Sequence, residues 1–572
     1  MKNRYIAGAF AVMAALTLGS CSDSFLDEEP KSQVSSGTVS ASEAGATAAV
    51  TGLSRQMQRQ YSTLKNGNLN ASGETFFANV YGEGLGPDCN AGEITNYVRS
   101  GIKPQNFRYP TGWWPSWMYH YAYSIIGSAN SILGNLPEEP ETSSQYWLAA
   151  SALTMRAHAY TRLMQVHAPR WVDSNNGNAH CIVLRVQAGE PNDKQFSTCN
   201  EVYDQLYSDL TKAISYFEKT EKKRGDQLFF VDKSVACGIF ARLALLKDDY
   251  QTAQKMAHEA RQGYTIMSQN DYLSGFTTVN GEWMWAPAQD PLGVYYWGFG
   301  PHNACNGHYV KSWGYTSSMQ RNLYNHLKAS DVRSQLYFGP LCVKHAPELA
   351  SKYGITESDF DDASIYSNTT YGVSITGTGT KPKGKNLAMW NFIQEYGKKF
   401  ANLRPEDIKG IYPTNSKGLS FGINYKFQGL PDGYTSCWIP YMRAAEMLLI
   451  EAEAACQNND NTTAVSCIKE LMAKRDPQYV IPATSGKALL DEVKLQRRIE
   501  LWGEGFNWFD FKRWNEVIEY KGFDKNDVVN SGSYPTTVAA TYTPDFMLGW
   551  RAAIPQEEFT YNKTADPSLV GQ

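Results

Sequence analysis

Apolar residues recur every three or four positions over much of the first half of the chain. One such stripe runs through Ala46, Val50, Leu53, Met57 and Tyr61. This spacing places the apolar side chains on one face of a helix and leaves the opposite face for solvent. Three further stripes begin at Trp117, Ala152 and Leu206. The pattern therefore predicts a mainly α-helical fold.

The segment 234–262 predicts two antiparallel helices that lie unusually close together. Alanines precede a short turn at Asp248-Asp249 and follow it at Ala253, Ala257 and Ala260. Small side chains at these positions allow close approach, as in the helix-turn-helix unit of tetratricopeptide repeats. The segment 440–475 repeats the pattern around a turn at 458–461, and a last pair is predicted at 487–502 and 508–520.

The segment between these helical parts has a different composition. Gly, Pro, Asn, Ser and aromatic residues dominate residues 264–438, and the glycines between Gly372 and Gly384 exclude a long helix there. We expect loops, short helices and a few short strands, and loops on a helical scaffold are common ligand sites. The predicted organisation is an N-terminal helical repeat part (41–263), a loop-rich ligand-binding lobe (264–438) and a C-terminal helical repeat part with a tail (439–572), intertwined as one domain.

The first 21 residues have the pattern of an export signal. Lys2 and Arg4 precede an uncharged run that ends at Leu18-Gly19-Ser20-Cys21. The run is short for a membrane span, so it predicts a signal peptide over residues 1–20. A Cys directly after Leu-Gly-Ser predicts lipid attachment, such as palmitate, at Cys21, with signal cleavage without lipid as the alternative. The polar residues 22–40 would then form a tether to the membrane.

Charge and composition narrow the classes of ligand. The formal charge is −4, and removal of Lys2 and Arg4 with the signal peptide makes it −6. This acidity argues against nucleic-acid binding, which depends on neutralising phosphates. Aromatic residues make up 13% of the chain, including 35 Tyr and 15 Trp. Their flat apolar faces and polar edges suit amphipathic ligands.

Two aromatic windows, residues 109–123 (which include Tyr123) and residues 283–315, are candidate binding surfaces. A sugar ring can stack its C–H face on an indole or phenol while its hydroxyls bond to polar groups at the rim. Trp117 and Tyr121 follow a helical stripe and are expected in the core. Loop positions interrupted by Pro and Gly are expected to be exposed, although a local aromatic cluster that packs the lobe remains an alternative. The predicted ligand-binding rings are Trp113, Trp114, Trp283, Trp285, Tyr296, Trp297 and Trp313.

The sequence gives little support for a catalytic site or a metal-binding site in this protein. His302, Cys305 and His308 have the spacing of a partial zinc site but no evident fourth ligand, so we predict no metal. Glu500 and Glu504 lie one helical turn apart, but the neighbouring arginines favour structural ion pairs over an acid–base pair. We predict no catalytic residue and no cofactor. Cys456 and Cys467 could pair across facing helices.

Several motifs, in their order along the chain, resemble the SusD/RagB family of outer-membrane nutrient-binding lipoproteins. They are the opening 20–30, the helical motif Trp117-x3-Tyr121-x3-Ile125-x3-Ala129-Asn130, the motif Met155-Arg156-Ala157-x2-Tyr160, the segment 443–454, the segment 497–514 and the closing Ile554-Pro555-x2-Glu558 with Asn562. The resemblance implies a tetratricopeptide-like scaffold with four helix pairs and an irregular lobe.

The resemblance also implies a role and a partner. Members of the family act as lids on a SusC-like TonB-dependent transporter barrel and deliver oligomers, usually glycans and sometimes peptides. Ligand contacts near the loop after the first helix would fall at Asp88 and Asn90. The acidic segment 27–29 after Cys21 is similar to signals for display at the cell surface. The alternatives are a glycoside hydrolase and a peptide-binding or purely structural repeat scaffold.

Overall fold

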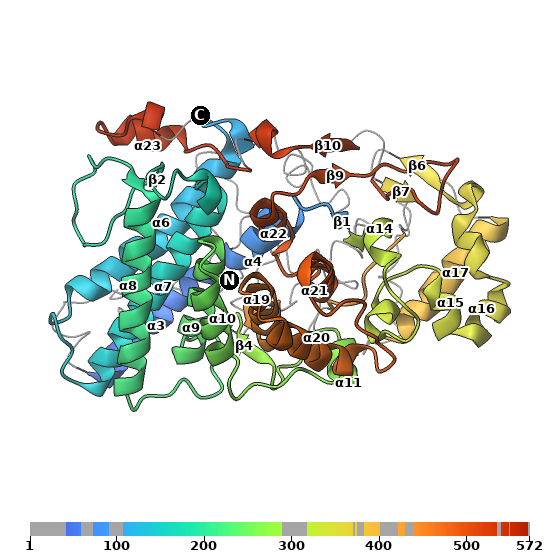
Figure 1. Ribbon diagram of the computed structural model, residues 1–572, viewed down its shortest axis with the longest axis horizontal. Helices are drawn as coiled ribbons and strands as arrows, with labels where there is room; N and C mark the ends of the chain where they lie inside the picture. Colours follow the sequence, from blue (N-terminus) through green and yellow to red (C-terminus); the bar gives the residue numbers. More distant parts are fainter. Residues whose placement is uncertain are drawn as a thin grey trace, which may run out of the picture.

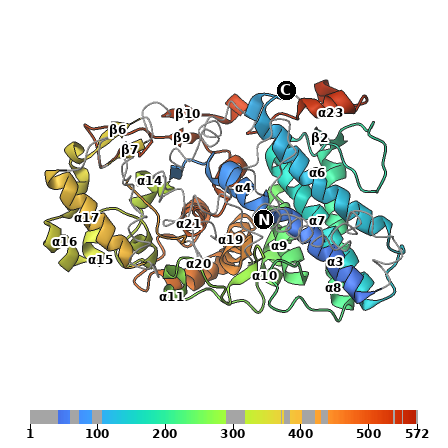
Figure 2. The same ribbon diagram turned by 180° about the vertical axis from the view of Figure 1, so that it is seen from behind.

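The computed structural model describes residues 42–58, 73–90, 107–288, 317–369, 372–374, 383–400, 421–428, 439–534, 539–547 and 550–569. The molecule is elongated, with long helices at one end and an irregular lobe at the other (Figures 1 and 2). This arrangement confirms the predicted mainly helical class. Among the described residues, no helix is both long and apolar enough to cross a bilayer.

The long helices of the first half gather around one central helix. They are α3 (Glu43–Arg55), α6 (Trp113–Gly134), α7 (Ser143–His167), α8 (Cys199–Lys219), α9 (Lys233–Leu246) and α10 (Tyr250–Ala260). Every residue of α7 from Trp147 onward is buried, because α3, α6, α8 and α9 all contact it. The helices α7 and α8 begin at capping boxes, in which Thr142 and Thr198 bond to backbone N–H groups of the first turn.

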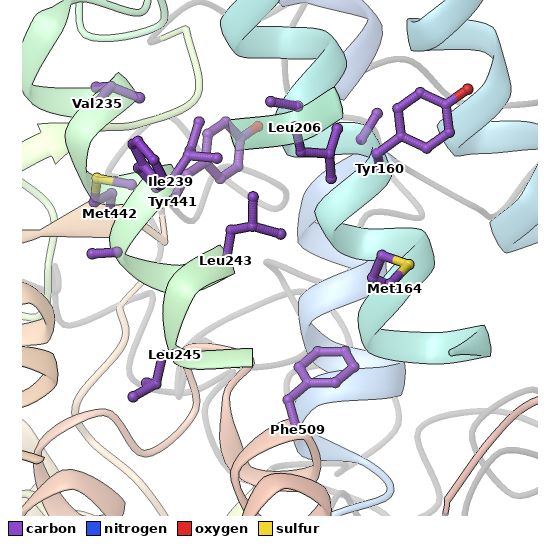
Figure 3. Packing of buried hydrophobic residues seen from close by; sticks show 14 of the residues in the cluster. Tyr160, Met164, Leu206, Val235, Ile239, Leu243, Leu245, Tyr441, Met442 and Phe509 are labelled. Atoms are coloured by element: carbon purple, nitrogen blue, oxygen red, sulfur yellow. The ribbon is translucent and has the colours of Figure 1, made fainter. Parts of the chain in front are cut away.

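The small residues of α9 and α10 allow the two helices to lie close together, as their spacing predicts. The two helices pack against each other around the turn at Asp248-Asp249. Asp249 caps α10 by accepting a hydrogen bond from the backbone N–H of Thr252. Figure 3 shows Val235, Ile239 and Leu243 of α9 directed into the same apolar interior as Met442 and Tyr441.

The C-terminal part supplies four more helices: α19 (Ala444–Gln457), α20 (Asn461–Arg475), α21 (Gly486–Glu500) and α22 (Asn507–Trp514). The pair α19–α20 confirms the prediction for 440–475. The last predicted helix is too long, because α22 ends at Trp514 and not at residue 520. Asn515 takes a left-handed conformation with φ of 59°, which ends the helix, and strand β9 (Ile518–Tyr520) follows.

Among its described residues, the irregular lobe contains four helices of seven residues or fewer and, contrary to the expectation of short helices, one helix of 15 residues, α17 (Gly384–Lys398). The short helices are α11 (Gln269–Leu273), α14 (Arg321–Tyr324), α15 (Leu341–His345) and α16 (Pro347–Tyr353). Short elements near the chain ends complete the helical set: α4 (Gly73–Phe77), the π-helix η3 (Ala78–Glu83) and α23 (Gln556–Tyr561). The 3-10 turns are η2 (Gln56–Gln58), η5 (Trp171–Asp173), η6 (Val332–Leu336), η7 (Glu357–Asp361), η8 (Ala363–Ile365), η9 (Pro544–Met547) and η10 (Pro567–Leu569).

The described strands form two-stranded antiparallel ribbons that tie distant segments together. Their pairs are β1 (Cys89–Asn90) with β5 (Ser318–Met319), β2 (His180–Ile182) with β3 (Ser197–Thr198), β4 (Trp283–Trp285) with β8 (Met442–Arg443), β6 (Ser367–Thr369) with β7 (Gly372–Ser374), and β9 with β10 (Ala540–Tyr542). The ribbon β4–β8 joins the start of the irregular lobe to the start of α19.

The buried apolar residues form two large clusters. The first lies among the helices α3 to α10, α19, α20 and α22. The second lies in the irregular lobe and includes Leu336, Phe392 and Tyr425. The helix α21 belongs to both, since Val493 near its middle lies in the first cluster and Ile499 near its end lies in the second. This helix therefore connects the two ends of the molecule.

Candidate functional site

Two of the predicted binding rings are interior residues. Trp283 and Trp285 are only 2% and 0% exposed. Strand β4 carries both rings and pairs with β8 between the two apolar clusters, so Trp283 packs in the second cluster and Trp285 in the first. The prediction that these two rings face solvent is wrong. The chain-breaking residues that suggested a loop begin only at Pro287, after the strand has ended.

Trp114 and Asp88 are also buried. The segment around Pro115 forms the first turn of α6, where a proline is tolerated because no intrahelical N–H bond is lost. Trp114 stacks on Phe107 with ring centroids 5.9 Å apart. Asp88 accepts hydrogen bonds from Arg498 at 2.6 and 2.8 Å and from Asn507 at 2.6 Å. The expectation that these two residues are open to ligand is wrong, since Asp88 holds α21 and the start of α22.

For the remaining predicted ligand-binding residues, the structure does not describe the side chains. Tyr296, Trp297 and Trp313 lie outside the described residues, as do Cys21 and the predicted zinc-like spacing at His302, Cys305 and His308. Trp113 and Asn90 lie in α6 and β1, but their side chains are not described. Their proposed contact with ligand stays a prediction. Trp117 and Tyr121 are buried and stacked, as their helical spacing predicted.

Glu500 and Glu504 are structural, as the sequence indicated, although their partners are not the neighbouring arginines. Glu500 is fully buried and pairs with Arg443, Arg475 and Arg333 at 2.9 to 3.3 Å. Burial alone would raise the pKa of Glu500, but the guanidinium groups lower it well below its usual range. Glu504 pairs with Arg443 and Lys426. A carboxylate locked in this way cannot act as a general acid.

A large open cavity lies at the helical end of the molecule. Its volume is about 1000 Å³, and it lies between α6, the loop 185–192 and the tail 555–562. Figures 1 and 2 show α23, within this tail, beside β2 and α6. We call it the α6 cavity. Its size is in the range of small-molecule and oligomer sites.

The floor of the α6 cavity is the polar face of α6. Ser116, His120, Tyr123, Gly127 and Ser131 follow one another at helical spacing and line the cavity. The opposite face of the same helix carries Trp117, Tyr121, Ile125 and Ala129, which are buried in the core. The apolar stripe thus fixes which way the polar face points.

The loop 185–192 is held by its own polar groups. The Arg185 guanidinium donates to the carbonyls of Pro191 and Asn192 at 2.6 and 2.7 Å. The Glu190 carboxylate accepts from the backbone N–H groups of Val186 and Gln187 at 2.6 and 2.7 Å. Asn130 of α6 donates to the carbonyl of Arg185. This wall of the cavity is therefore fixed before any ligand binds.

The tail is anchored on both sides of the cavity. Asn562 is buried, and its side-chain amide accepts a hydrogen bond from the backbone N–H of Lys194 and donates one to the carbonyl of Lys194, next to the loop. The backbone N–H of Gln556 donates to the carbonyl of Pro110, just before α6. Glu557 accepts a hydrogen bond from Ser116 at 3.0 Å. Tyr561 projects from this tail and is 72% exposed, which leaves its ring available as a platform.

The phenols of Tyr119 and Tyr123 and the imidazole of His120, which line the cavity, are neutral at pH 7. Tyr119 and Tyr123 lie with ring centroids 4.6 Å apart. Burial, together with the nearby Glu558 carboxylate, raises the pKa of Tyr119, whose hydroxyl makes no hydrogen bond of standard geometry to any described residue. Partial burial lowers the pKa of His120. The cavity thus offers phenol faces, amides and carboxylates, a mixture that suits a polyhydroxylated ligand.

Metal binding and disulfide formation both depend on how His, Cys and acidic side chains are placed in the described part of the chain. No group of three or more His, Cys, Asp or Glu residues there has the arrangement of a metal site. Cys456 and Cys467 are free thiols, so the pairing suggested by their spacing is not formed. The burial of Cys467 raises the pKa of its thiol and keeps it protonated.

Family models match most of the chain in two parts. Residues 24–245 match the model described as "Starch-binding associating with outer membrane", and residues 295–568 match the SusD family model. A SusD-like protein of Formosa agariphila is 32% identical over 88 residues, which span 14% of this chain and 18% of that protein.

Solved structures share the fold along nearly the whole chain. A SusD-like carbohydrate-binding protein of Bacteroides vulgatus gives a TM-score of 0.64 at 18% identity, over 91% of this chain and 97% of that one. A SusD superfamily protein of Bacteroides thetaiotaomicron gives 0.60 at 16% identity, over 92% and 99%. At such identities the likeness establishes the fold and leaves the ligand open.

Proposed function

Since the chain belongs to the SusD family, we propose that it is a lipoprotein of the outer membrane that binds nutrient glycans without altering them. It is anchored through Cys21, faces the cell exterior and delivers its ligand to a SusC-like TonB-dependent transporter. The observation that carries the binding function is the α6 cavity, whose tyrosine faces, amides and carboxylates match the two kinds of surface on a sugar.

The absence of catalysis in this proposal rests on the state of the carboxylates. Glycoside hydrolysis needs two carboxyl groups on either side of the scissile bond, one of them protonated. Glu500 and Glu504 are committed to arginines and a lysine in the interior. In the cavity, Glu190 and Glu558 accept hydrogen bonds that hold the loop and the tail. These groups support binding and positioning.

Tyr296, Trp297 and Trp313, with Trp113, remain candidates for further ring contacts with a long ligand. A peptide ligand is the alternative for the same cavity, since tyrosines and carboxylates also bind peptides. We therefore test both classes in one titration series.

A cavity-filling substitution tests the proposal. Gly127 is exposed on α6, lines the cavity and has nothing within 4 Å of an added Cβ, so Gly127→Trp would place a large ring in part of the cavity without straining the helix. Gly52 on α3 is equally exposed and equally open, and it provides the matched control Gly52→Trp. Isothermal titration against panels of oligosaccharides and peptides should find a glycan whose affinity falls about tenfold or more in Gly127→Trp.

The control variant should bind like the unchanged protein, and no new reducing ends should form during incubation. If every glycan fails to bind, or a peptide binds in its place, the proposed function is wrong. If a glycan binds equally well to Gly127→Trp, the α6 cavity is not its site.

A further inference from the structure

The charges around the α6 cavity are unequal. Arg185 is the one Lys or Arg among the described residues that line it, whereas Glu190, Glu557 and Glu558 all line it. His120 adds no positive charge at pH 7, because burial lowers its pKa. The Lys194 ammonium pairs with Glu190 but does not itself line the cavity.

The single guanidinium is already engaged. Both terminal nitrogens of Arg185 donate to backbone carbonyls of its own loop, and one of them lies 3.9 Å from Glu558. Recognition of a carboxylate or sulfate usually depends on an arginine that presents two parallel N–H groups to the ligand. Arg185 presents these donors to its loop and thus serves to shape the wall.

The Glu190 carboxylate stays ionised. Burial alone would raise the pKa of Glu190, but hydrogen bonds from Lys194, Val186 and Gln187 lower it overall. Glu557 and Glu558 accept hydrogen bonds from Ser116 and Asn562. A carboxylate has about four lone-pair positions, so each can also accept from a sugar hydroxyl.

We infer that the α6 cavity selects neutral glycans and rejects glycans that carry carboxylate or sulfate groups. The inference rests on the proposed function and adds the chemical class of its ligand. Hydroxyl groups of a neutral chain donate to the fixed carboxylates, while its ring faces contact Tyr561 and the Tyr119–Tyr123 wall. An acidic sugar in the same position brings like charges together in a partly desolvated site, which costs affinity.

Matched ligands test this selection. The probes are hexasaccharides of glucan, galactan and mannan, each compared with its uronate counterpart, in which every C6 alcohol is replaced by a carboxylate. Titration of the full protein should show at least one neutral chain that binds, and its uronate counterpart should bind about 100-fold more weakly at low salt. The ratio should shrink at high salt, because salt screens the repulsion.

Variants that lack one carboxylate charge show whether charge or shape causes the weaker binding of uronate chains. Glu557→Gln keeps the side-chain length and should reduce the neutral-to-uronate ratio about tenfold by improving uronate binding. Glu348→Gln on the exposed end of α16 is the matched control and should leave the ratio unchanged. Gly127→Trp should weaken the neutral chain, which places the effect in the cavity.

The outcomes distinguish this inference from the proposed function. If a uronate chain binds as tightly as its neutral counterpart and Gly127→Trp weakens both, the selection is wrong and the binding function stands. If Glu557→Gln leaves the ratio unchanged, the charge of the cavity is not its cause and the inference fails. If no neutral chain binds, or lysine-rich peptides bind instead, the inference fails together with the proposed function.

Discussion

At the scale of single residues, Glu83 is the most unusual carboxylate outside the α6 cavity. It ends η3 and is 2% exposed. One oxygen accepts backbone N–H bonds from Gly505 and Phe506 at 2.7 and 3.1 Å, while the other is buried and makes no hydrogen bond of standard geometry to any described residue. Burial raises the pKa of Glu83 to about 7, although the backbone hydrogen bonds act in the opposite direction.

This raised pKa makes the free energy of unfolding depend on pH. The folded protein holds the Glu83 proton up to about pH 7, whereas the unfolded chain releases it near pH 4.5. The contribution of Glu83 to the free energy of unfolding is therefore largest below pH 4.5, and it is lost as the pH rises through 7. Glu83→Gln keeps the accepting oxygen and cannot ionise. We therefore compare the free energy of unfolding of this variant with that of the unchanged protein. The difference should shift in favour of the variant by on the order of 2–3 kcal/mol from pH 5 to pH 8.

Urea unfolding of both proteins at pH 5 and at pH 8 measures the difference in their free energies of unfolding. Glu348→Gln, at an exposed position of α16, is the control for the loss of one charge. Parallel stability curves for Glu83→Gln and the unchanged protein would show that Glu83 is ionised in the folded state throughout this range.

At the scale of elements, the contact between η3 and the turn before α22 depends on two glycines. A Cβ on Gly82 would lie 2.1 Å from the carbonyl oxygen of Gly505, and a Cβ on Gly505 would lie 2.4 Å from the Cβ of Ala78. Both obstacles are backbone or short side-chain atoms, which have no flexible end that could move aside. The same contact receives the two hydrogen bonds of Glu83.

Gly82→Ala should therefore destabilise the protein by roughly 1–3 kcal/mol, since the two backbones must separate. The matched substitution Gly127→Ala places the same methyl group on an exposed helical position with nothing within 4 Å. It should stabilise by about 0.5–1 kcal/mol, because alanine favours the helix. Thermal unfolding of the two variants gives the comparison, and equal shifts in Tm would contradict the close-contact argument.

The helices could be predicted from the sequence because their periodic apolar stripes are local. The alanines around Asp248-Asp249 are sufficient to predict α9 and α10. Strand pairing is not local: β4 is buried because β8, about 160 positions later, lies beside it. The aromatic residues of β4 therefore looked like loop residues.

The α6 cavity was missed for the same reason. Its walls come from 111–131, 185–192 and 555–562, three segments that no sequence pattern connects. One signal was present in retrospect. Ser116, His120, Tyr123, Gly127 and Ser131 form a polar stripe on a helix whose other face is fully apolar, and Tyr123 was counted only as part of an aromatic window.

At the scale of the whole molecule, a buried ion-pair cluster links the two apolar clusters. Glu500 at the end of α21 faces Arg443 from β8, Arg475 from the end of α20 and Arg333 from η6 in the irregular lobe. Glu282, just before β4, also pairs with Arg443, at 2.6 Å, as does Glu504. Elements from both ends of the molecule thus share one set of charges.

Such a cluster fixes the relative position of the two parts more than it adds net stability. Burying the charges costs hydration, which the pairing roughly offsets. Removal of one member is different, because its partners stay buried with one opposite charge fewer to compensate them. Any ligand held at the helical end and any contact made by the irregular lobe depend on this fixed geometry.

Glu500→Gln should therefore destabilise the whole molecule by roughly 3–5 kcal/mol, since three guanidinium groups lose their shared negative partner. Asp491→Asn is the control: it removes one carboxylate from an exposed pair with Lys487 on the same helix, and should cost less than about 1 kcal/mol. Calorimetry should show a lower Tm for Glu500→Gln, with both apolar clusters unfolding in one transition or separating into two. An unchanged Tm would mean that the cluster does not couple the lobes, and the fixed geometry would then have to come from other links, such as the β4–β8 ribbon and the apolar contacts of α21.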